Sequence, residues 1–368
     1  MSKPRRQHFL PKSALRPFAD VKDAKNDKYF VEVGNVKTKE VKYPISITNI
    51  CVSKNLYTLP EAEGDAKYLV EKFYAENIDS EYPHVYKLLT DPKIEDITDE
   101  QRHKVLNVIL SLYFRNARFL QEKNIEVDEM IERMGRDDFG SDDSILFLQY
   151  EKRKYNFKRT DILKIKEEIK INNRIDFIIQ HLSDWQKFVK LKDQSQIGVS
   201  KIIGDIKLIT GDNPVRIYNE YGDTDDIFNP SNSIQFPLDQ EHLLWISPNS
   251  KEWDRNRIYR QVRDKWFAIT SNHSIAIYAS EWIISKQGAV GRFFREMEQY
   301  NSFTPENKQN LDDIITISTE LPKLLKFMEA NGGPFSEASK KRLNELNKCP
   351  IFSKDPQFQI FYNEIVGS

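Results

Sequence analysis

Strand-like and helix-like segments follow one another along this 368-residue chain without a regular strand–helix–strand rhythm. Runs rich in β-branched and aromatic residues lie at 29–33 and 41–47 and recur between 206 and 247. Long stretches with apolar residues at helical spacing separate these runs. Because a parallel α/β fold needs repeated βαβ units, this order favours an α+β fold. We expect a small mixed or antiparallel β-layer, built from both sets of strands and covered by helices.

The helix that follows residue 98 is the most clearly marked one. Thr98 to Gln101 match a capping box, and Val105, Ile109 and Leu112 share one face. Residues 255–269 and 272–286 are also predicted to be helical. Residues 1–290 are interpreted as one domain, in which the charge-rich segment 121–160 is a loop insertion. Residues 291–368 are predicted to form a helical C-terminal appendage.

Charge limits the kinds of partner that the chain can have. The 55 basic and 56 acidic residues give a net charge of −1, so the chain is not a nucleic-acid binder by bulk charge. A nucleic acid or nucleotide partner must therefore be held by a local basic patch. No apolar stretch is long enough to cross a membrane, so we expect no membrane partner and a cytoplasmic protein.

Motifs for metals and common cofactors are absent. Cys51 and Cys349 are far apart, and the six histidines show no ligand spacing such as HxxxH. There is no Walker loop, no GxGxxG and no GxSxG. No metal site is predicted from residue spacing, and the cofactor stays undetermined.

The N-terminal segment contains the first candidate residue, His8, between Arg5, Arg6 and Lys12. Histidine is the side chain best suited to proton transfer near neutral pH. It could equally be a structural histidine that is hydrogen-bonded into a turn at Pro11.

Two further candidates lie elsewhere in the chain. Asp212 and Asn213 follow a predicted strand, where they could act as an acid and a hydrogen-bond donor or simply form an Asx turn before Pro214. Arg115 lies at the edge of the apolar helix face, where it could bind an anion or pair with a buried acid such as Asp212. Arg118 is expected to point toward solvent.

The segment Gln7-His8-Phe9-Leu10-Pro11, with Leu15-Arg16 after it, resembles the start of an uncharacterised, mostly bacterial family, domain-of-unknown-function 4238. The segment from Leu208 to Val215 is similar to a second motif of this family. The chain departs from the family pattern at Gly211, where serine is frequent, and at Ala14, where an aromatic residue is usual. The resemblance implies that the histidine, the arginine helix and the Asp-Asn-Pro turn occur together.

Two hypotheses about function follow. In the first, the chain is a hydrolase for a phosphate-containing substrate, a nuclease or nucleotide-processing enzyme in bacterial defence against phage. His8, Asp212 and Asn213 would be catalytic, and Gln7, Arg16 and Arg115 would bind the substrate. In the second, the chain is a non-enzymatic binding or regulatory protein, and its QHxxP segment is a structural staple. The first hypothesis requires that His8 lies within bonding reach of Asp212.

Overall fold

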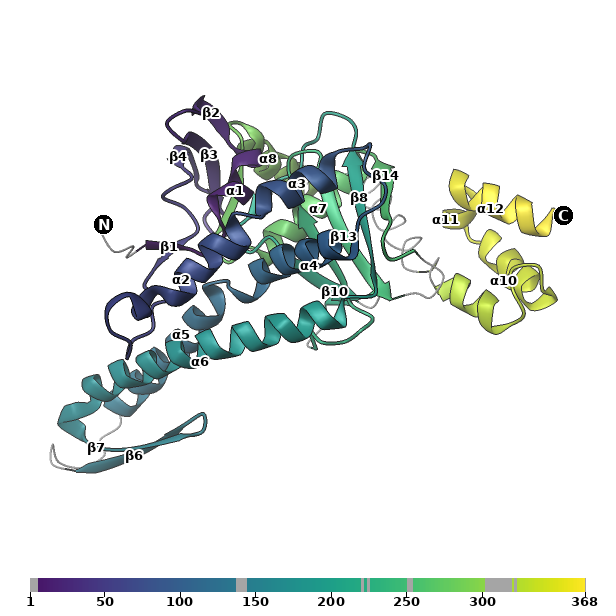
Figure 1. Ribbon diagram of the computed structural model, residues 1–368. Coiled ribbons are helices and arrows are strands. Elements are labelled where there is room, and N and C mark those ends of the chain that lie inside the picture. The colour runs from purple at the N-terminus through teal and green to yellow at the C-terminus, as the bar shows by residue number, and fades with distance from the viewer. Residues whose placement is uncertain are drawn as a thin grey trace. The chain divides into compact units, whose positions relative to one another are not determined.

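A computed structural model describes residues 6–136, 144–219, 222–223, 226–249, 254–301, 320 and 323–367 (Figure 1). The chain divides into two compact units, one of residues 1–219 and 223–292 and one of residues 220–222 and 293–368. The mixture of helices with largely antiparallel sheets confirms the α+β class. No helix in the described ranges is long and apolar enough to cross a bilayer.

The larger unit contains two main sheets rather than the single layer expected. The five-stranded antiparallel sheet has the order β2-β3-β15-β9, and β4 also pairs with β3. The six-stranded sheet has the order β11-β10-β12-β13-β8-β14. In it β8 and β14 are parallel, whereas β10 with β12, β12 with β13 and β13 with β8 are antiparallel. The strands of the five-stranded sheet are β2 (Asp20–Asp23), β3 (Lys28–Asn35), β4 (Val41–Ser46), β9 (Thr210–Gly211) and β15 (Trp282–Ser285). The strands of the six-stranded sheet are β8 (Ser195–Ile202), β10 (Arg216–Asn219), β11 (Gly222–Asp223), β12 (Ser233–Pro237), β13 (His242–Asn249) and β14 (Ile258–Arg263).

Two small two-stranded sheets complete the β-structure. The first pairs β1 (Arg6–His8) with β5 (Val52–Lys54) and so attaches the N-terminus to the body of the unit. The second is a hairpin of β6 (Ile145–Tyr150) and β7 (Arg153–Lys158).

Helices cover these sheets. α4 (Asp99–Phe114) begins with the predicted capping box, in which Thr98 accepts from the amide of Gln101 and the Gln101 side chain bonds back to Thr98. The other helices of this unit are α1 (Lys12–Leu15), α2 (Leu69–Tyr74), α3 (Tyr82–Thr90), α5 (Arg118–Arg136), α6 (Ile162–Leu191) and α7 (Lys265–Tyr278). Short helical turns lie at Arg16–Phe18, Gly64–Tyr68, Ala75–Asp79 and Arg159–Asp161. α8 (Ala289–Asn301) continues into the smaller unit, where the described residues also form helix at 323–330 and in α10 (Glu337–Asn347), α11 (Pro350–Ser353) and α12 (Pro356–Val366).

One hydrophobic core joins both sheets with α4. It contains Val33 of the five-stranded sheet, Ile109 of α4, and Ile197 and Leu244 of the six-stranded sheet, all at most 3% exposed. Along the six-stranded sheet these core residues alternate with residues that face the other way, as the period-two geometry of a strand requires. The six-stranded sheet therefore has an inner face on this core and an opposite face, here called the outer sheet face.

Two expectations need correction. The segment 121–160 is not a loop in its described residues: it holds most of α5 and the β6–β7 hairpin, which share a small core that includes Val127, Leu148 and Ile169. The helices predicted at 255–269 and 272–286 are wrong in part, because 282–285 form strand β15 and 258–263 pair with β8 as strand β14. That pairing joins residues about 60 positions apart, so the local sequence pattern does not reveal it.

Candidate functional site

Gln7 of β1 is fully buried and holds the N-terminal segment in place. Its Nε2 donates to Thr58 Oγ1 at 3.2 Å, and its Oε1 accepts from the Tyr57 amide at 2.7 Å. The Tyr57 hydroxyl donates in turn to the carbonyl of Arg115 at 2.5 Å. Both polar ends of Gln7 are thus used within the protein.

Arg115, at the C-terminal end of α4, is also fully buried. Its guanidinium donates to both carboxylate oxygens of Asp79, at 2.7 and 3.3 Å, and to the carbonyls of Phe9 and His8, at 3.0 Å each. It also lies 4.6 Å from the centre of the Tyr74 ring. Burial acts to lower the pKa of Arg115, but Asp79 together with Tyr57 and Tyr74 raises it. We call Gln7, Tyr57, Asp79 and Arg115 the N-terminal staple.

His8 is half-buried, and its Nε2 lies 3.3 Å from the carbonyl oxygen of Ile47. Burial lowers the pKa of His8. Arg16 lies further along the chain, where it pairs with Asp27 at 2.7 Å on the surface. In the described ranges no hydrogen bond joins His8 or Arg16 to Asp212.

Asp212 ends the short strand β9 and is 5% exposed. Its Oδ1 accepts from the Ser280 amide at 2.7 Å, and its Oδ2 accepts from the amides of Glu281 and Trp282 at 2.8 and 3.1 Å. Burial raises the pKa of Asp212, although these three amides act to lower it. The carboxylate joins β9 to the turn between α7 and β15.

Asn213 and Asn116 extend this arrangement. Asn213 Nδ2 donates to the Tyr278 carbonyl at 3.0 Å, and Asn116 Nδ2 donates to the Asp212 carbonyl at 2.9 Å and to Asn213 Oδ1 at 3.3 Å. Two adjacent residues at the end of α4 therefore contact the two motifs. Arg115 bonds the N-terminal segment, and Asn116 bonds the Asp-Asn turn. The structure thus brings the two motifs to the same helix end, but it does not place His8 on Asp212.

A cavity of about 580 Å³ opens beside this helix end. Phe9, Cys51, Asn116 and Asp212 line it, whereas Gln7, His8, Arg16 and Arg115 do not. Burial raises the pKa of the Cys51 thiol, so the thiol stays protonated at neutral pH. The polar groups at the base of the cavity bind each other or the backbone, and this favours a structural role for them.

The outer sheet face has a different character. A second cavity, of about 420 Å³, lies on it and is lined by glutamine, serine and tyrosine side chains, one tryptophan and two arginines, with no acid among the lining residues that the structure describes. These residues are Gln196, Ser200, Tyr218, Ser233, Gln235, Trp245, Ser247, Tyr259, Arg260, Gln261, Arg263 and Phe267. α7 covers one end of this face, where Leu243 packs against Ala268. The rest of the face is lined mainly by polar side chains. A sheet face that is covered by other parts of a protein is usually apolar.

Trp245 is the central residue of the outer sheet face. In the strand register it lies between Gln235 on β12 and Gly198 on β8, and Gly198 in turn pairs with Tyr259 on β14. The indole occupies the space above Gly198, because a Cβ added at residue 198 would overlap the ring. Glycine at 198 therefore lets the indole lie across the neighbouring strand.

Three side-chain atoms of the residues that line this cavity have no hydrogen-bond partner among the described residues. They are the ring nitrogen of Trp245, the hydroxyl of Ser200, which is 1% exposed, and Nε of Arg260, whose other guanidinium nitrogens donate to backbone carbonyls. An unsatisfied buried polar group costs about 1–3 kcal/mol. Arg263, at the exposed end of β14, stacks 5.2 Å from the Phe267 ring and supplies a cation at the margin of the cavity.

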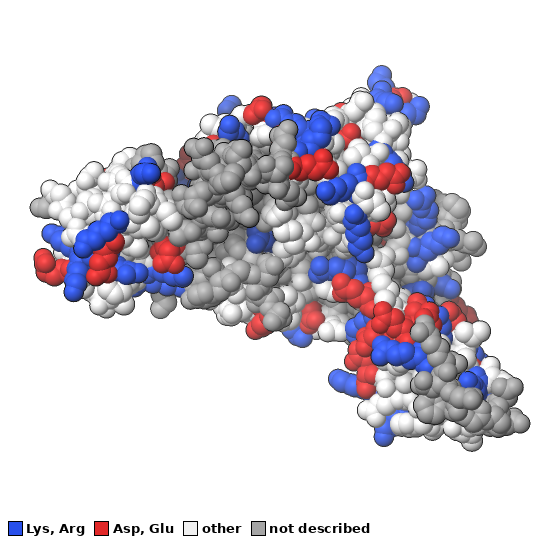
Figure 2. All heavy atoms as spheres, turned by 180° about the vertical axis from the view of Figure 1, so that it is seen from behind, with Lys and Arg blue, Asp and Glu red and all other residues white. Residues whose placement is uncertain are grey.

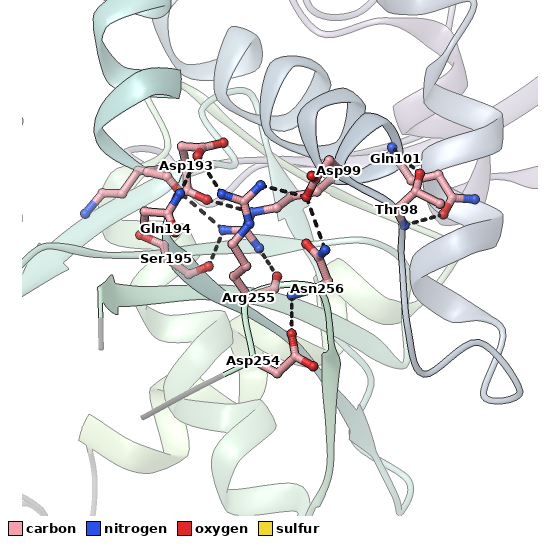
Figure 3. Close-up of polar contacts among 11 residues, drawn as sticks. Thr98, Asp99, Gln101, Asp193, Gln194, Ser195, Asp254, Arg255 and Asn256 are labelled. Atoms are coloured by element: carbon pink, nitrogen blue, oxygen red, sulfur yellow. Dashed lines mark hydrogen bonds and ion pairs between the residues drawn. The ribbon is translucent and has the colours of Figure 1, made fainter. Parts of the chain in front are cut away.

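A buried arginine network fixes the edge strand β14 and its neighbour β8 (Figure 3). Arg102 of α4, which is fully buried, donates to the carbonyls of Asp193, Arg255 and Ser195. Arg255 pairs with the carboxylates of Asp193 at 3.0 Å and Asp99 at 2.7 Å. Burial lowers the pKa of Arg102 to about 10, so it stays charged at neutral pH. The beginnings of β8 and β14 are thereby tied to α4 and to each other.

The sequence interpretation missed this face. A signal was available in residues 195–202, where Gln196, Gly198 and Ser200 alternate with Ile197 and Val199. Such alternation is typical of a strand with one polar face. In the described residues no group of three histidine, cysteine, aspartate or glutamate side chains is arranged to hold a metal ion.

Comparison with known proteins gives a family but no function. A family model described as "Protein of unknown function (DUF4238)" matches residues 6–289, more than three quarters of the 368 residues. No curated protein and no solved structure matches the chain.

Proposed function

The chain belongs to the DUF4238 family of proteins of unknown function, and we propose that it is a binding protein that takes a nucleotide on its outer sheet face. In this proposal the QHxxP segment is a structural staple and not part of a catalytic centre. The proposal includes a cytoplasmic location, where nucleotides are available.

The site residues predicted from the sequence already make hydrogen bonds within the protein. This favours a nucleotide-binding protein over a hydrolase that uses these residues. The Arg115 guanidinium already bonds Asp79 and two carbonyls, so holding a phosphate would require breaking those bonds. The Asp212 carboxylate already accepts three amides and has no hydrogen bond to an imidazole among the described residues. A general base must reach the proton that it removes, directly or through one water. These contacts favour a structural role for Arg115 and Asp212.

The chemistry of the outer sheet face fits a nucleotide. The central observation is the indole of Trp245 lying over Gly198, with the ring nitrogen and the Ser200 hydroxyl lacking hydrogen-bond partners among the described residues. A nucleobase has a flat face that stacks on aromatic rings, and polar edges that bond amide and hydroxyl groups. The phosphate of the nucleotide would lie toward the Arg263 guanidinium, which is positively charged. No acid that would repel the phosphate lines the cavity in the described residues. The cavity volume of about 420 Å³ lies within the range typical of small-ligand sites.

Equilibrium binding of AMP, GMP, CMP and UMP to the full chain tests this proposal. We expect at least one of them to bind, and we expect Gly198→Ala to weaken that binding about 5- to 150-fold, since stacking of one base is worth about 1–3 kcal/mol. The alanine Cβ would overlap the Trp245 ring and so displace the indole. The substitution does not change the charge of the face. Lys87→Gln, at an exposed site on α3, is the matched control and should bind as the wild type does.

Phosphate release from ATP and cleavage of labelled oligonucleotides are measured on the same samples. We expect no turnover by the wild type above the background without protein. Two outcomes contradict the proposal. One is that none of the four nucleotides binds. The other is that the wild type hydrolyses a substrate and His8→Ala abolishes this without unfolding the chain, which would support the hydrolase hypothesis.

A further inference from the structure

The β6–β7 hairpin lies beside one end of the paired helices α5 and α6 (Figure 1). Its inner face carries Leu148, Tyr150, Tyr155 and Phe157, which pack on α5 and α6. The strand register therefore places the alternate residues on the other face, and there Ile145 pairs with Lys158, Phe147 with Asn156, and Gln149 with Lys154. The hairpin thus has one anchored face and one exposed face.

The hairpin has a positive net charge, although the chain as a whole is nearly neutral. Residues 144–160 hold five basic residues (152, 153, 154, 158 and 159) and one acid, Glu151, so their net charge is 5 − 1 = +4, against −1 for the whole chain. Arg153 pairs with Asp176 of α6, whereas Lys152 and Lys154 are exposed and no ion pair to them is found in the described ranges. Figure 2 shows basic and acidic side chains near one another on the described surface seen from behind. The positive charge is therefore local.

The exposed face also carries apolar side chains that nothing covers in the described residues. Phe147 is 60% exposed and Ile145 is 77% exposed. A large, exposed aromatic ring beside lysines is the combination with which proteins bind single strands, because bases stack on the ring and phosphates pair with the cations. An anionic membrane would also attract lysines, but the polar Gln149 and Asn156 on the same face do not suit insertion into lipid.

We propose that the outer face of the β6–β7 hairpin binds single-stranded nucleic acid, with Lys152 and Lys154 on phosphates and Phe147 stacked on a base. This site is separate from the outer sheet face and does not depend on the nucleotide proposal. Binding there is independent of base sequence, because the hairpin offers a ring and cations and few groups placed to read base edges.

Fluorescence anisotropy with a labelled 20-nucleotide oligo(dT) and the full chain, at several salt concentrations, tests the proposal. For the pair Lys152→Gln and Lys154→Gln, we expect the slope of log K against log salt to fall by about 1.4, since each phosphate contact on a single strand contributes about 0.7. Phe147→Ala should weaken binding about tenfold without changing that slope. The control pair Lys87→Gln and Lys93→Gln removes the same charge from exposed sites outside the hairpin and should change neither quantity.

Several results would overturn the proposal. They are an absence of oligo(dT) binding, an equal effect of the control pair, tighter binding of a duplex than of the single strand, and binding to phosphatidylserine–phosphatidylcholine vesicles in place of oligo(dT). Loss of oligo(dT) binding in Gly198→Ala with normal binding in Phe147→Ala would assign the nucleic acid to the outer sheet face instead. Phe147 is mostly exposed, so its substitution should leave the circular dichroism and the melting temperature unchanged.

Discussion

At the N-terminal staple both ends of Gln7 and the guanidinium of Arg115 reach partners inside the protein, whereas on the outer sheet face Ser200 and Trp245 are left without any in the described residues. Both regions are polar and both lie in the larger unit. Polar groups that satisfy one another stabilise one arrangement of the chain, and polar groups left open at a cavity remain available to a ligand. The comparison therefore distinguishes polar groups that bond within the protein from polar groups that have no partner among the described residues.

The largest effect that tests this comparison should come from Arg115. We expect Arg115→Met to lower the free energy of unfolding by about 3–5 kcal/mol, because it leaves Asp79 and two carbonyls without their partner. Urea denaturation monitored by circular dichroism measures this. A loss below about 1 kcal/mol, typical of an exposed ion pair, would show that the staple does not hold the fold.

The second test uses pH and His181, which lies beside the staple. His181 is 4% exposed, its Nδ1 lies 2.7 Å from the Phe177 carbonyl, and its Nε2 lies 2.7 Å from the Tyr74 hydroxyl. Burial lowers its pKa to about 4 in the folded chain, against 6.5 for the unperturbed side chain. A lowered pKa means that the folded state binds the proton more weakly than the unfolded state. The stability is therefore fully present above pH 6.5 and is lost as the pH falls toward 4.

This loss should amount to about 3 kcal/mol between pH 6.5 and pH 4. Urea denaturation at several pH values measures it. His181→Gln, which cannot be protonated there, is the control and should show a shallower decline. Burial also lowers the pKa of His8 and acts in the same direction, so the variant should keep part of the slope. Equal slopes for the wild type and the variant would be evidence against a neutral, structural His181.

The third test concerns Asp212. An asparagine has one carbonyl oxygen where the carboxylate has two, so Asp212→Asn should leave at least one of the three amides of residues 280–282 without its partner. We expect a loss of about 1–3 kcal/mol in unfolding free energy, with nucleotide binding unchanged. Thermal denaturation and the nucleotide titration are measured together. Unchanged stability with lost binding would move Asp212 from the fold to the ligand site.

The smallest effect is expected at Arg16. Its ion pair with Asp27 lies on the surface, and exposed pairs contribute about 0.2–1 kcal/mol. Arg16→Ala should therefore change the unfolding free energy by less than about 1 kcal/mol and leave nucleotide binding intact. A large loss of ligand binding would restore Arg16 as a substrate-binding residue.

Local sequence patterns predicted the features that depend on neighbouring residues. The capping box of Thr98 and Gln101 forms as expected, the α+β class is confirmed, and the family match covers the segments from which the resemblance was inferred. From its position in the sequence, Arg115 could either bind an anion or pair with a buried acid such as Asp212. In the structure it pairs with a different acid. That partner is Asp79, which no local pattern could identify because it lies 36 residues away.

By itself, the amino-acid sequence determined that this chain would mix helices with largely antiparallel strands, and that it is a member of its family. It also set the near-zero net charge that restricts any anionic partner to a local patch. The tertiary structure alone decided which polar groups are satisfied. Gln7 and Ser200 are both polar and buried, but Gln7 bonds the backbone of residue 57, whereas Ser200 lines a cavity and has no hydrogen-bond partner among the described residues. That difference arises because hydrogen-bond partners far apart along the chain come together only when the strands pair and the helices pack.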